Sequence, residues 1–159
     1  MKLITLTQGK FARVDDEDFE WLSKFKWYCS HGYAVRRSPI IIDGRHRPVW
    51  MHREIANTPD GYETDHIDGN KLNNTRANLR ICTHAENHRN VGLRSTNTSG
   101  YKGVSFYKRY NRWRARIWAN DRLVFLGYFD SALEAACAYN NSAMLHYGEF
   151  AWLNQVLPK

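Results

Sequence analysis

The sequence predicts an α+β protein made of three consecutive segments. Residues 112–118 alternate polar or cationic with apolar side chains and precede an alanine-rich helical pattern, which together predict a sheet packed on one helix. Residues 61–90 have the outline strand, polar loop, strand, helix. An N-terminal α/β support region, residues 1–60, comes before both. The chain has 159 residues, of which 43% are hydrophobic, so it can bury a core.

The support region combines short strands with one helix. Residues 3–6 are strand-like, and the acidic residues 15–17 suit the positive end of a helix that begins there. Apolar residues then follow at helical spacing, at Phe19, Leu22 and Phe25. Asp43-Gly44 predicts a hairpin turn. Strands are expected at residues 33–35, 39–42 and 48–51.

The second segment is dense in polar side chains. It starts with Asp65-His66 and continues through a turn at Asp68-Gly69-Asn70. Residues 78–82 are expected to form a short strand, and Thr83 is expected to cap a helix that includes Asn87. A unit of this kind brings His66, Asn78 and Asn87 together although they are distant in the sequence.

This segment resembles the HNH endonuclease family, whose ββα-metal motif has an Asp-His pair, an asparagine that opens the second strand and a final asparagine or histidine on the helix. The matching residues are Asp65-His66, Asn78 twelve residues after the histidine, and Asn87 nine residues later. The surrounding stretches DHIDGNKLNN and NLR are similar to the subfamily found in phage and intron-associated nucleases. With Met51-His52-Arg53 included, the resemblance covers about 40 residues.

The resemblance implies phosphodiester hydrolysis with one divalent cation. His66 would be the general base, a role that suits an unperturbed imidazole pKa of ~6.5. Asp65 and Asn87 would ligate Mg²⁺ or Mn²⁺ through oxygen, and Asn78 would orient the imidazole through its amide. One metal and one base imply cleavage strand by strand, which leaves 5′-phosphate and 3′-hydroxyl ends.

Each of these four residues also has a purely structural interpretation. The two asparagines suit turns or helix caps, the aspartate suits a loop, and the histidine suits a structural contact. Their joint spacing favours catalysis. His84 and His88, at i, i+4 spacing beside Cys82, suggest a zinc site, but no fourth ligand is evident. No structural zinc is therefore expected, and packing on the support region must replace the zinc knuckles that some HNH proteins carry.

The positive charge of the chain is concentrated in one stretch. The formal net charge is +7, and residues 89–122 alone hold nine basic and one acidic side chain. A basic block interleaved with Tyr, Trp and Phe suits nucleic acid, and a solvated basic face is the alternative. A membrane-surface helix fits less well, because the block alternates with period two.

The third segment, residues 99–154, has the clearest periodicity. The strand at residues 112–118 is followed by a turn at Asn120-Asp121 and a partner strand at residues 123–126. Ser131 and Glu134 form a capping box that opens the alanine-rich helix, and Gly148 ends it.

This segment resembles the plant ethylene-response-factor (Apetala-type) DNA-binding domain. The stretches that carry the resemblance are residues 101–104, 113–117, 125–130, 134–139 and 153–154. It implies a three-stranded antiparallel sheet in the DNA major groove, with the helix behind it. Ser105 and Trp118 stand where arginines are usual and Phe125 where a tryptophan is usual, so the recognised DNA sequence should differ. By position, the expected DNA-binding residues are Lys102, Ser105, Arg112, Arg114, Arg116, Trp118 and Phe125.

Together these features predict a site-preferring DNA endonuclease of the phage or homing type, in which the sheet helps to select where the nuclease centre cuts. Double-stranded DNA is the expected partner, with no membrane and no small-molecule organic cofactor. A monomer is expected to nick one strand and a homodimer to cut both. The alternatives are a non-catalytic sequence-specific DNA-binding regulator that retains a nuclease scaffold, and a repair or RNA-processing nuclease.

Other features bear on location and domain boundaries. No apolar run approaches the ~20 residues needed to cross a bilayer, the N-terminus lacks a signal peptide, and Cys29, Cys82 and Cys137 form no CxxC pair. A cytoplasmic protein encoded by a phage or bacterium is therefore expected. The expected domains are an N-terminal support region (1–60), a nuclease module (51–90), a linker (91–98) and a DNA-binding domain (99–154).

Overall fold

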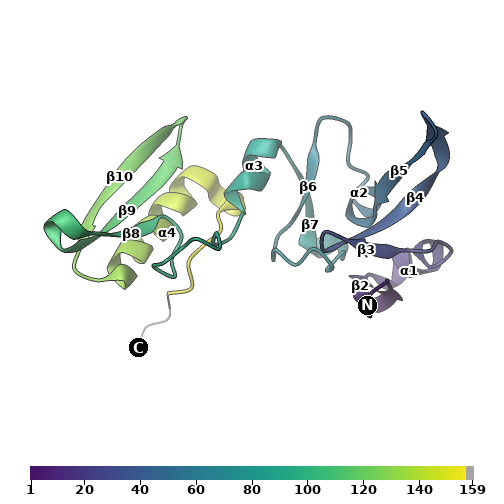
Figure 1. Cartoon of the computed structure of the whole chain (residues 1–159), viewed down its shortest axis with the longest axis horizontal. Coiled ribbons are helices and arrows are strands. Elements are labelled where there is room, and N and C mark those ends of the chain that lie inside the picture. The colour runs from purple at the N-terminus through teal and green to yellow at the C-terminus, as the bar shows by residue number, and fades with distance from the viewer. Residues whose placement is uncertain (157–159) are drawn as a thin grey trace. The chain divides into compact units, whose positions relative to one another are not determined.

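The computed structural model describes residues 1–156, and the chain divides into two compact units, Met1–Asn87 and the part that begins at His88 (Figure 1). Both units mix helices with antiparallel strands, which confirms the α+β class. No helix among the described residues is long and apolar enough to span a bilayer.

In residues 1–87 the strands pair as β1-β2, β3-β4-β5 and β6-β7, all antiparallel. The elements up to the end of α3 are β1 (Lys2–Thr5), β2 (Phe11–Val14), α1 (Asp16–Leu22), β3 (Tyr28–Ser30), β4 (Tyr33–Ile42), β5 (Arg45–Trp50), α2 (Met51–Ile55), β6 (Glu63–His66), η1 (Arg76–Asn78), β7 (Leu79–Cys82) and α3 (His84–Arg89).

The support region and the strand–loop–strand segment share one hydrophobic core. Its buried residues come from β1, β2, α1, β3, β4 and α2, and include the fully buried Val14, Leu22 and Met51. Leu72 and Leu79, which belong to the polar segment, pack against the same cluster. Because burial of apolar area is the main force that holds small units together, residues 1–60 and the nuclease motif stabilise each other.

The structure corrects several details of the predicted support region. The first helix ends at Leu22, where the Leu22 carbonyl accepts bonds from the backbone of Phe25 and from Trp27 Nε1, so Phe25 lies beyond it. Strand β2 was not predicted. Strand β4 runs through Pro39, where the pairing with β5 is irregular and no ladder donor is needed. The turn at Asp43-Gly44 is confirmed.

The support region also holds the loop between β6 and β7. The Arg13 amide donates to Leu72 O at 2.8 Å, and the Asn74 amide donates to Arg13 O at 2.8 Å. Farther along the loop, the Arg76 guanidinium forms bonds of 2.9 and 2.8 Å with the buried carboxylate of Asp18. The loop is therefore anchored to residues about 60 positions earlier in the chain.

Replacement of Arg76 by alanine is expected to destabilise the protein by about 2 kcal/mol, because it leaves the charge of Asp18 buried without its partner. Chemical denaturation of the full chain would measure this loss. Glu17→Gln is the matched control: Glu17 also pairs with Arg76, but it is largely exposed, so less than about 0.5 kcal/mol should be lost. Equal effects of the two changes would contradict this account of the anchor.

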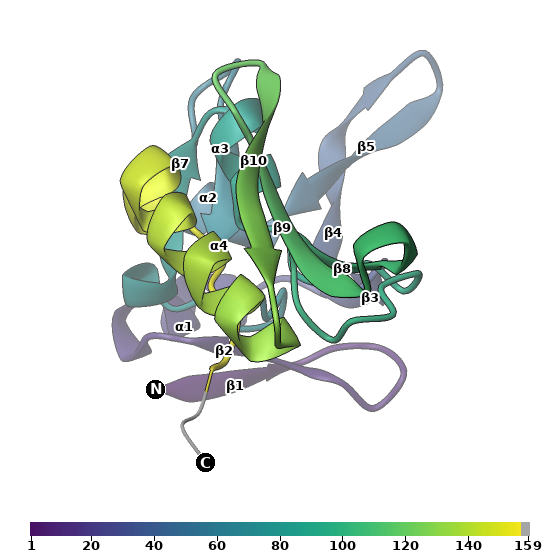
Figure 2. The ribbon, with the colours of Figure 1, turned by 90° about the vertical axis from the view of Figure 1, so that its left-hand side faces the viewer.

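The second unit is a three-stranded antiparallel sheet of order β10-β9-β8, with α4 lying against one face (Figure 2). The core contains the small side chains Ala115, Ala135, Ala136 and Ala143, which let helix and sheet approach closely. Ser131 caps α4 by accepting from the Glu134 amide, as predicted. The elements of the second unit after α3 are β8 (Val104–Tyr107), η2 (Lys108–Tyr110), β9 (Arg112–Ala119), β10 (Arg122–Phe129), α4 (Ala132–Tyr147) and η3 (Gly148–Phe150).

Candidate functional site

The strand pair β6–β7 positions the Asp-His dipeptide. Asp65 lies opposite Arg80 and His66 opposite Leu79 in the ladder, and both members of the dipeptide are buried. After β7, the Thr83 and Glu86 side chains and amides bond reciprocally and open α3. The predicted strand–loop–strand–helix outline is therefore present.

His66 is fixed by an asparagine that the sequence did not single out. Its Nε2 lies 3.2 Å from Asn74 Oδ1, and Asn74 is fully buried. An amide oxygen can only accept, so this contact favours the tautomer with the proton on Nε2 and the lone pair on Nδ1. Asn74 is itself placed by its backbone bond to Arg13. The support region thus contributes to the orientation of the imidazole.

Aromatic rings surround His66 on another side. The His52 ring lies 5.1 Å from the His66 ring and the Tyr33 ring 6.0 Å from it, measured between centroids. Trp50 packs on Tyr33 and on His52. These rings come from β4, β5 and α2, so the hairpin formed by β4 and β5 has its base against the candidate catalytic histidine.

Burial keeps both imidazoles neutral near pH 7. It lowers the pKa of His66 below its usual value, outweighing the opposite effects of the Asn74 bond and of the charges on Asp68 and Asp65. Burial, followed by the charges of His66 and Arg53, lowers the pKa of His52 to about 3. Nδ1 of His52 has no hydrogen-bond partner among the described residues.

Asn78 braces the loop that follows His66. Its Oδ1 accepts from the Asp68 amide at 3.0 Å, and its Nδ2 donates to Asp68 Oδ1 at 2.9 Å and to Asn73 O at 2.8 Å. Its carbonyl accepts from the Ile67 amide at 2.9 Å. Through these contacts Asn78 acts on the backbone next to the imidazole.

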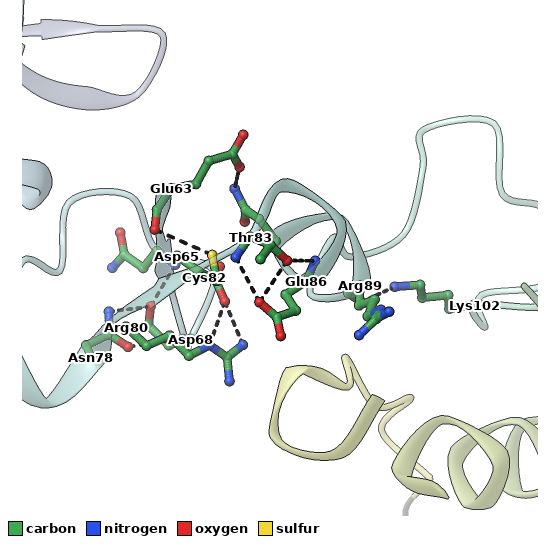
Figure 3. Close-up of polar contacts among 12 residues, drawn as sticks. Glu63, Asp65, Asp68, Asn78, Arg80, Cys82, Thr83, Glu86, Arg89 and Lys102 are labelled. Atoms are coloured by element: carbon green, nitrogen blue, oxygen red, sulfur yellow. Dashed lines mark hydrogen bonds and ion pairs between the residues drawn. The ribbon is translucent and has the colours of Figure 1, made fainter. Parts of the chain in front are cut away.

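Asp65 is held by Arg80 (Figure 3), and Asn87 is held by Glu63. Asp65 Oδ2 accepts from Arg80 Nε at 2.9 Å and from Arg80 Nη2 at 2.6 Å. Glu63 lies two residues before Asp65 on β6, and its carboxylate contacts Asn87 Nδ2 at 2.5 Å and His84 Nδ1 at 2.6 Å. Because Nδ2 of Asn87 bonds to Glu63, its Oδ1 is the end of the amide suited to a cation.

The β8–β10 sheet presents one face to α4 and leaves the other uncovered. Ala115, Ile117 and Ala119 of β9 are buried, whereas the residues that alternate with them are not. The strand register places Ser105 opposite Arg114, and Phe125 opposite Arg116. Six of the seven predicted DNA-binding residues lie on this uncovered face: Ser105, Arg112, Arg114, Arg116, Trp118 and Phe125. Three residues that were not predicted lie there as well: Tyr107, Leu123 and Tyr128.

Two charged residues of this predicted set form ion pairs or hydrogen bonds with groups outside the set. Arg112 pairs with Asp130 at 3.2 Å, with both side chains exposed. Lys102 Nζ donates to the Arg89 carbonyl at 2.7 Å (Figure 3) and to the Val91 carbonyl at 2.5 Å. Burial lowers the pKa of Lys102 to about 8. Lys102 therefore holds residues 89–91 within the second unit and lies outside the uncovered face.

Comparisons with known proteins agree with the features of the first unit. A family model described as HNH endonuclease matches residues 43–89. Over 109 residues the chain is 39% identical to Protein 3.8 of Escherichia phage T7, covering 67% of this chain and 87% of that protein. Over 154 residues it is 32% identical to the uncharacterized HNH endonuclease L560 of Acanthamoeba polyphaga mimivirus, covering 94% of this chain and 77% of that protein. The chain belongs to the HNH endonuclease family.

This HNH endonuclease also shares a shorter similarity with plant proteins. Over 60 residues it is 43% identical to the AP2-like ethylene-responsive transcription factor TOE2 of Arabidopsis thaliana, covering 38% of this chain but 12% of that protein. The length agrees with the resemblance of residues 99–154 to the Apetala-type domain. No solved structure matches the chain significantly.

Sequence reasoning missed several residues of the HNH site. Asn74 adjoins His66 in space only because a loop of 12 residues folds back, although the pair Asn73-Asn74 was visible within the matching stretch. His52 lies in the Met51-His52-Arg53 stretch that the resemblance included without a role. Arg80 meets Asp65 because the strand register places them opposite each other. Glu63 meets Asn87 and His84 across the contact between β6 and α3.

Proposed function

We propose that this HNH endonuclease is a site-preferring DNA endonuclease of the phage or homing type, which hydrolyses phosphodiester bonds with His66 as general base. The observation that carries the proposal is the buried imidazole of His66, which Asn74 fixes through Nε2 and which follows the buried Asp65 in β6. A neutral, oriented imidazole is what proton abstraction from water requires.

The proposed steps at the protein's own atoms are simple. Nδ1 of His66 takes a proton from the attacking water, while Asn74 Oδ1 stabilises the imidazolium through the Nε2 proton. Asn78 bonds the backbone of Ile67 and Asp68, the two residues that follow His66, and so helps to keep the imidazole in place. The products are a 5′-phosphate and a 3′-hydroxyl, because water attacks phosphorus and the 3′-oxygen leaves and takes a proton from solvent.

The residues present fit a hard divalent cation, Mg²⁺ or Mn²⁺. Asp65 and Asn87 offer a carboxylate and an amide oxygen, and such cations commonly take only one or two protein ligands, with water and substrate phosphate completing the set. No group of three His, Cys, Asp or Glu side chains within residues 1–156 is arranged to hold a metal. The cation would offset negative charge on the reacting phosphate.

Double-stranded DNA is the proposed partner of the uncovered sheet face. Arg114 and Arg116 supply cationic contacts, while the exposed rings of Trp118 and Phe125 offer surface to bases or sugars. The Arg114 guanidinium lies over the Tyr107 ring at 4.9 Å and donates to Ser105, so it is held toward this face. The similarity to the plant factor supports this assignment.

Replacement of Arg114 and Arg116 by alanine is expected to weaken duplex binding and to flatten its salt dependence by about 2 in the log–log slope, one for each lost phosphate contact. Fluorescence anisotropy with a 40-base-pair duplex at several salt concentrations measures this slope. Arg122→Ala, in register with the buried Ala119, is the control and should change it little. An unchanged salt slope in the double variant would contradict the assignment of DNA binding to this face.

The cleavage half of the proposal is tested with supercoiled plasmid and the full chain. Magnesium should permit conversion to the nicked circle, and excess chelator should abolish it. Plasmid that stays supercoiled with magnesium and with manganese, while the protein still binds DNA, would contradict the proposal.

A further inference from the structure

The outer part of the β4–β5 hairpin has no packing role in the first unit. It projects away from the other strands and helices of that unit in both views (Figures 1 and 2). Residues 39–48 are all exposed, and the side chains of Ile40 and Ile41 are 66% and 58% exposed. A two-stranded hairpin without a packed face is marginally stable by itself in water. The exposed isoleucines therefore call for a partner.

The charge of this outer part indicates the kind of partner. Residues 37–48 contain three arginines, Arg37, Arg45 and Arg47, and one acidic residue, Asp43. Among the described residues none of the three arginines forms an ion pair, whereas Arg36 nearer the base pairs with Glu54 at 2.6 Å. A cationic surface with unpaired arginines fits a polyanion better than it fits another copy of this basic chain.

The shape of the hairpin fits the DNA major groove. A two-stranded β-ribbon is one of the two elements that this groove admits, and apolar side chains there contact the methyl groups of thymine. In a ribbon the side chains of successive residues point to opposite faces, so arginines and isoleucines can meet both phosphates and base edges.

The base of the same hairpin touches the candidate cutting centre. Tyr33 begins β4 and Trp50 ends β5, and the Tyr33 ring packs against both Trp50 and His66. Arg45 at the tip lies five positions before Trp50 at the base, so the two are roughly 17 Å apart at ~3.3 Å per residue. For a ribbon that lies along the groove, this length spans about five base pairs of B-DNA at ~3.4 Å each.

We propose that residues 37–48 form a second DNA-reading element, a β-ribbon that enters the major groove about five base pairs from the phosphate cut at His66. This inference rests on the proposed DNA endonuclease function. It adds a reader that belongs to the same compact unit as the cutting centre, independent of the β8–β10 sheet. Its contacts would therefore keep a fixed spacing from the nick.

The test uses the full chain with Arg45→Ser/Arg47→Ser, with Ile40→Ser/Ile42→Ser, and with the control Lys10→Ser/Lys24→Ser, which removes two exposed cations of the same unit. The probes are a 40-base-pair duplex for the salt slope of binding and a supercoiled plasmid of known sequence, whose nicks are mapped by primer extension. Circular dichroism checks that each variant is folded.

The arginine variant should flatten the salt slope by about 2. The isoleucine variant should keep the slope and change base preference about five base pairs from the mapped nicks. The lysine control should change neither. Behaviour of both hairpin variants like the lysine control would overturn the inference. Loss of self-association in the isoleucine variant, with slope and nick pattern unchanged, would overturn it in favour of a second copy. Because the slope needs no cleavage, failure of the nuclease proposal is seen separately in the plasmid assay.

Discussion

Replacement of His66 by alanine should lower the rate of plasmid nicking by about 10³-fold, while DNA affinity changes little. General-base catalysis contributes roughly 10²–10⁴-fold to enzymatic rates, and no other described imidazole contacts Asn74 in the same way. Nicking under single-turnover conditions, with binding measured separately, separates the chemical step from affinity. Wild-type rates in the His66→Ala protein would refute its role as base.

The pH profile gives an independent test of the same residue. Burial disfavours the imidazolium, so the pKa of His66 lies below its usual value and the base stays neutral to lower pH. Nicking should therefore be constant near neutral pH and should fall, as pH decreases, only through a value below ~6.5. Asn74→Ala should reduce the nicking rate less than His66→Ala does. It should also shift the pH profile to lower pH, because the lost bond to Asn74 raises the pKa of His66.

Replacement of Gly103 by alanine should unfold the second unit at a temperature about 10 °C or more lower. A Cβ there would lie 2.1 Å from the Tyr139 ring and 2.6 Å from Arg116 O, and Gly103 has φ +76°. Left-handed backbone costs roughly 1–2 kcal/mol for a non-glycine residue and overpacking about 1–3 kcal/mol more. A loss of about 3 kcal/mol in the free energy of unfolding lowers the Tm of a unit of this size by about 10 °C or more.

Gly100→Ala separates the two causes, since Gly100 has nearly the same φ, +75°, and no atom within 4 Å of the added Cβ. Calorimetry of the full chain should show a smaller shift for Gly100→Ala than for Gly103→Ala. Equal shifts would mean that backbone strain alone acts at Gly103. The Gly103 variant should also lose affinity for duplex DNA, because the sheet that carries Arg114 and Arg116 depends on this packing.

Local patterns in the sequence predicted what depends on near neighbours. The alternation through Arg112, Arg114 and Arg116 predicted one face of β9, and the cap residue Thr83 predicted the start of α3. The role of Asn74 was not predictable in this way. Its position depends on a backbone bond to Arg13, which lies 61 residues earlier, and such pairing follows from tertiary packing.

The position of Lys102 also depends on tertiary packing and was not predicted for that reason. By position in the family pattern it belongs to the DNA face, but its ammonium bonds the carbonyls of Arg89 and Val91, which the family pattern does not cover. The exposed β4–β5 hairpin was predicted as strands and a turn, yet its isolation from the core becomes visible only when the partners of every other strand are known.

The most direct test of the central claim compares wild-type and His66→Ala protein on supercoiled plasmid with magnesium, followed by treatment of the products with DNA ligase. The wild-type chain should produce nicked circles that ligase reseals without prior phosphatase or kinase, because the ends are 5′-phosphate and 3′-hydroxyl, and His66→Ala should leave the plasmid supercoiled. Nicks that ligase cannot reseal, or equal amounts of nicked circle from both proteins, would contradict hydrolysis by a histidine base at this site.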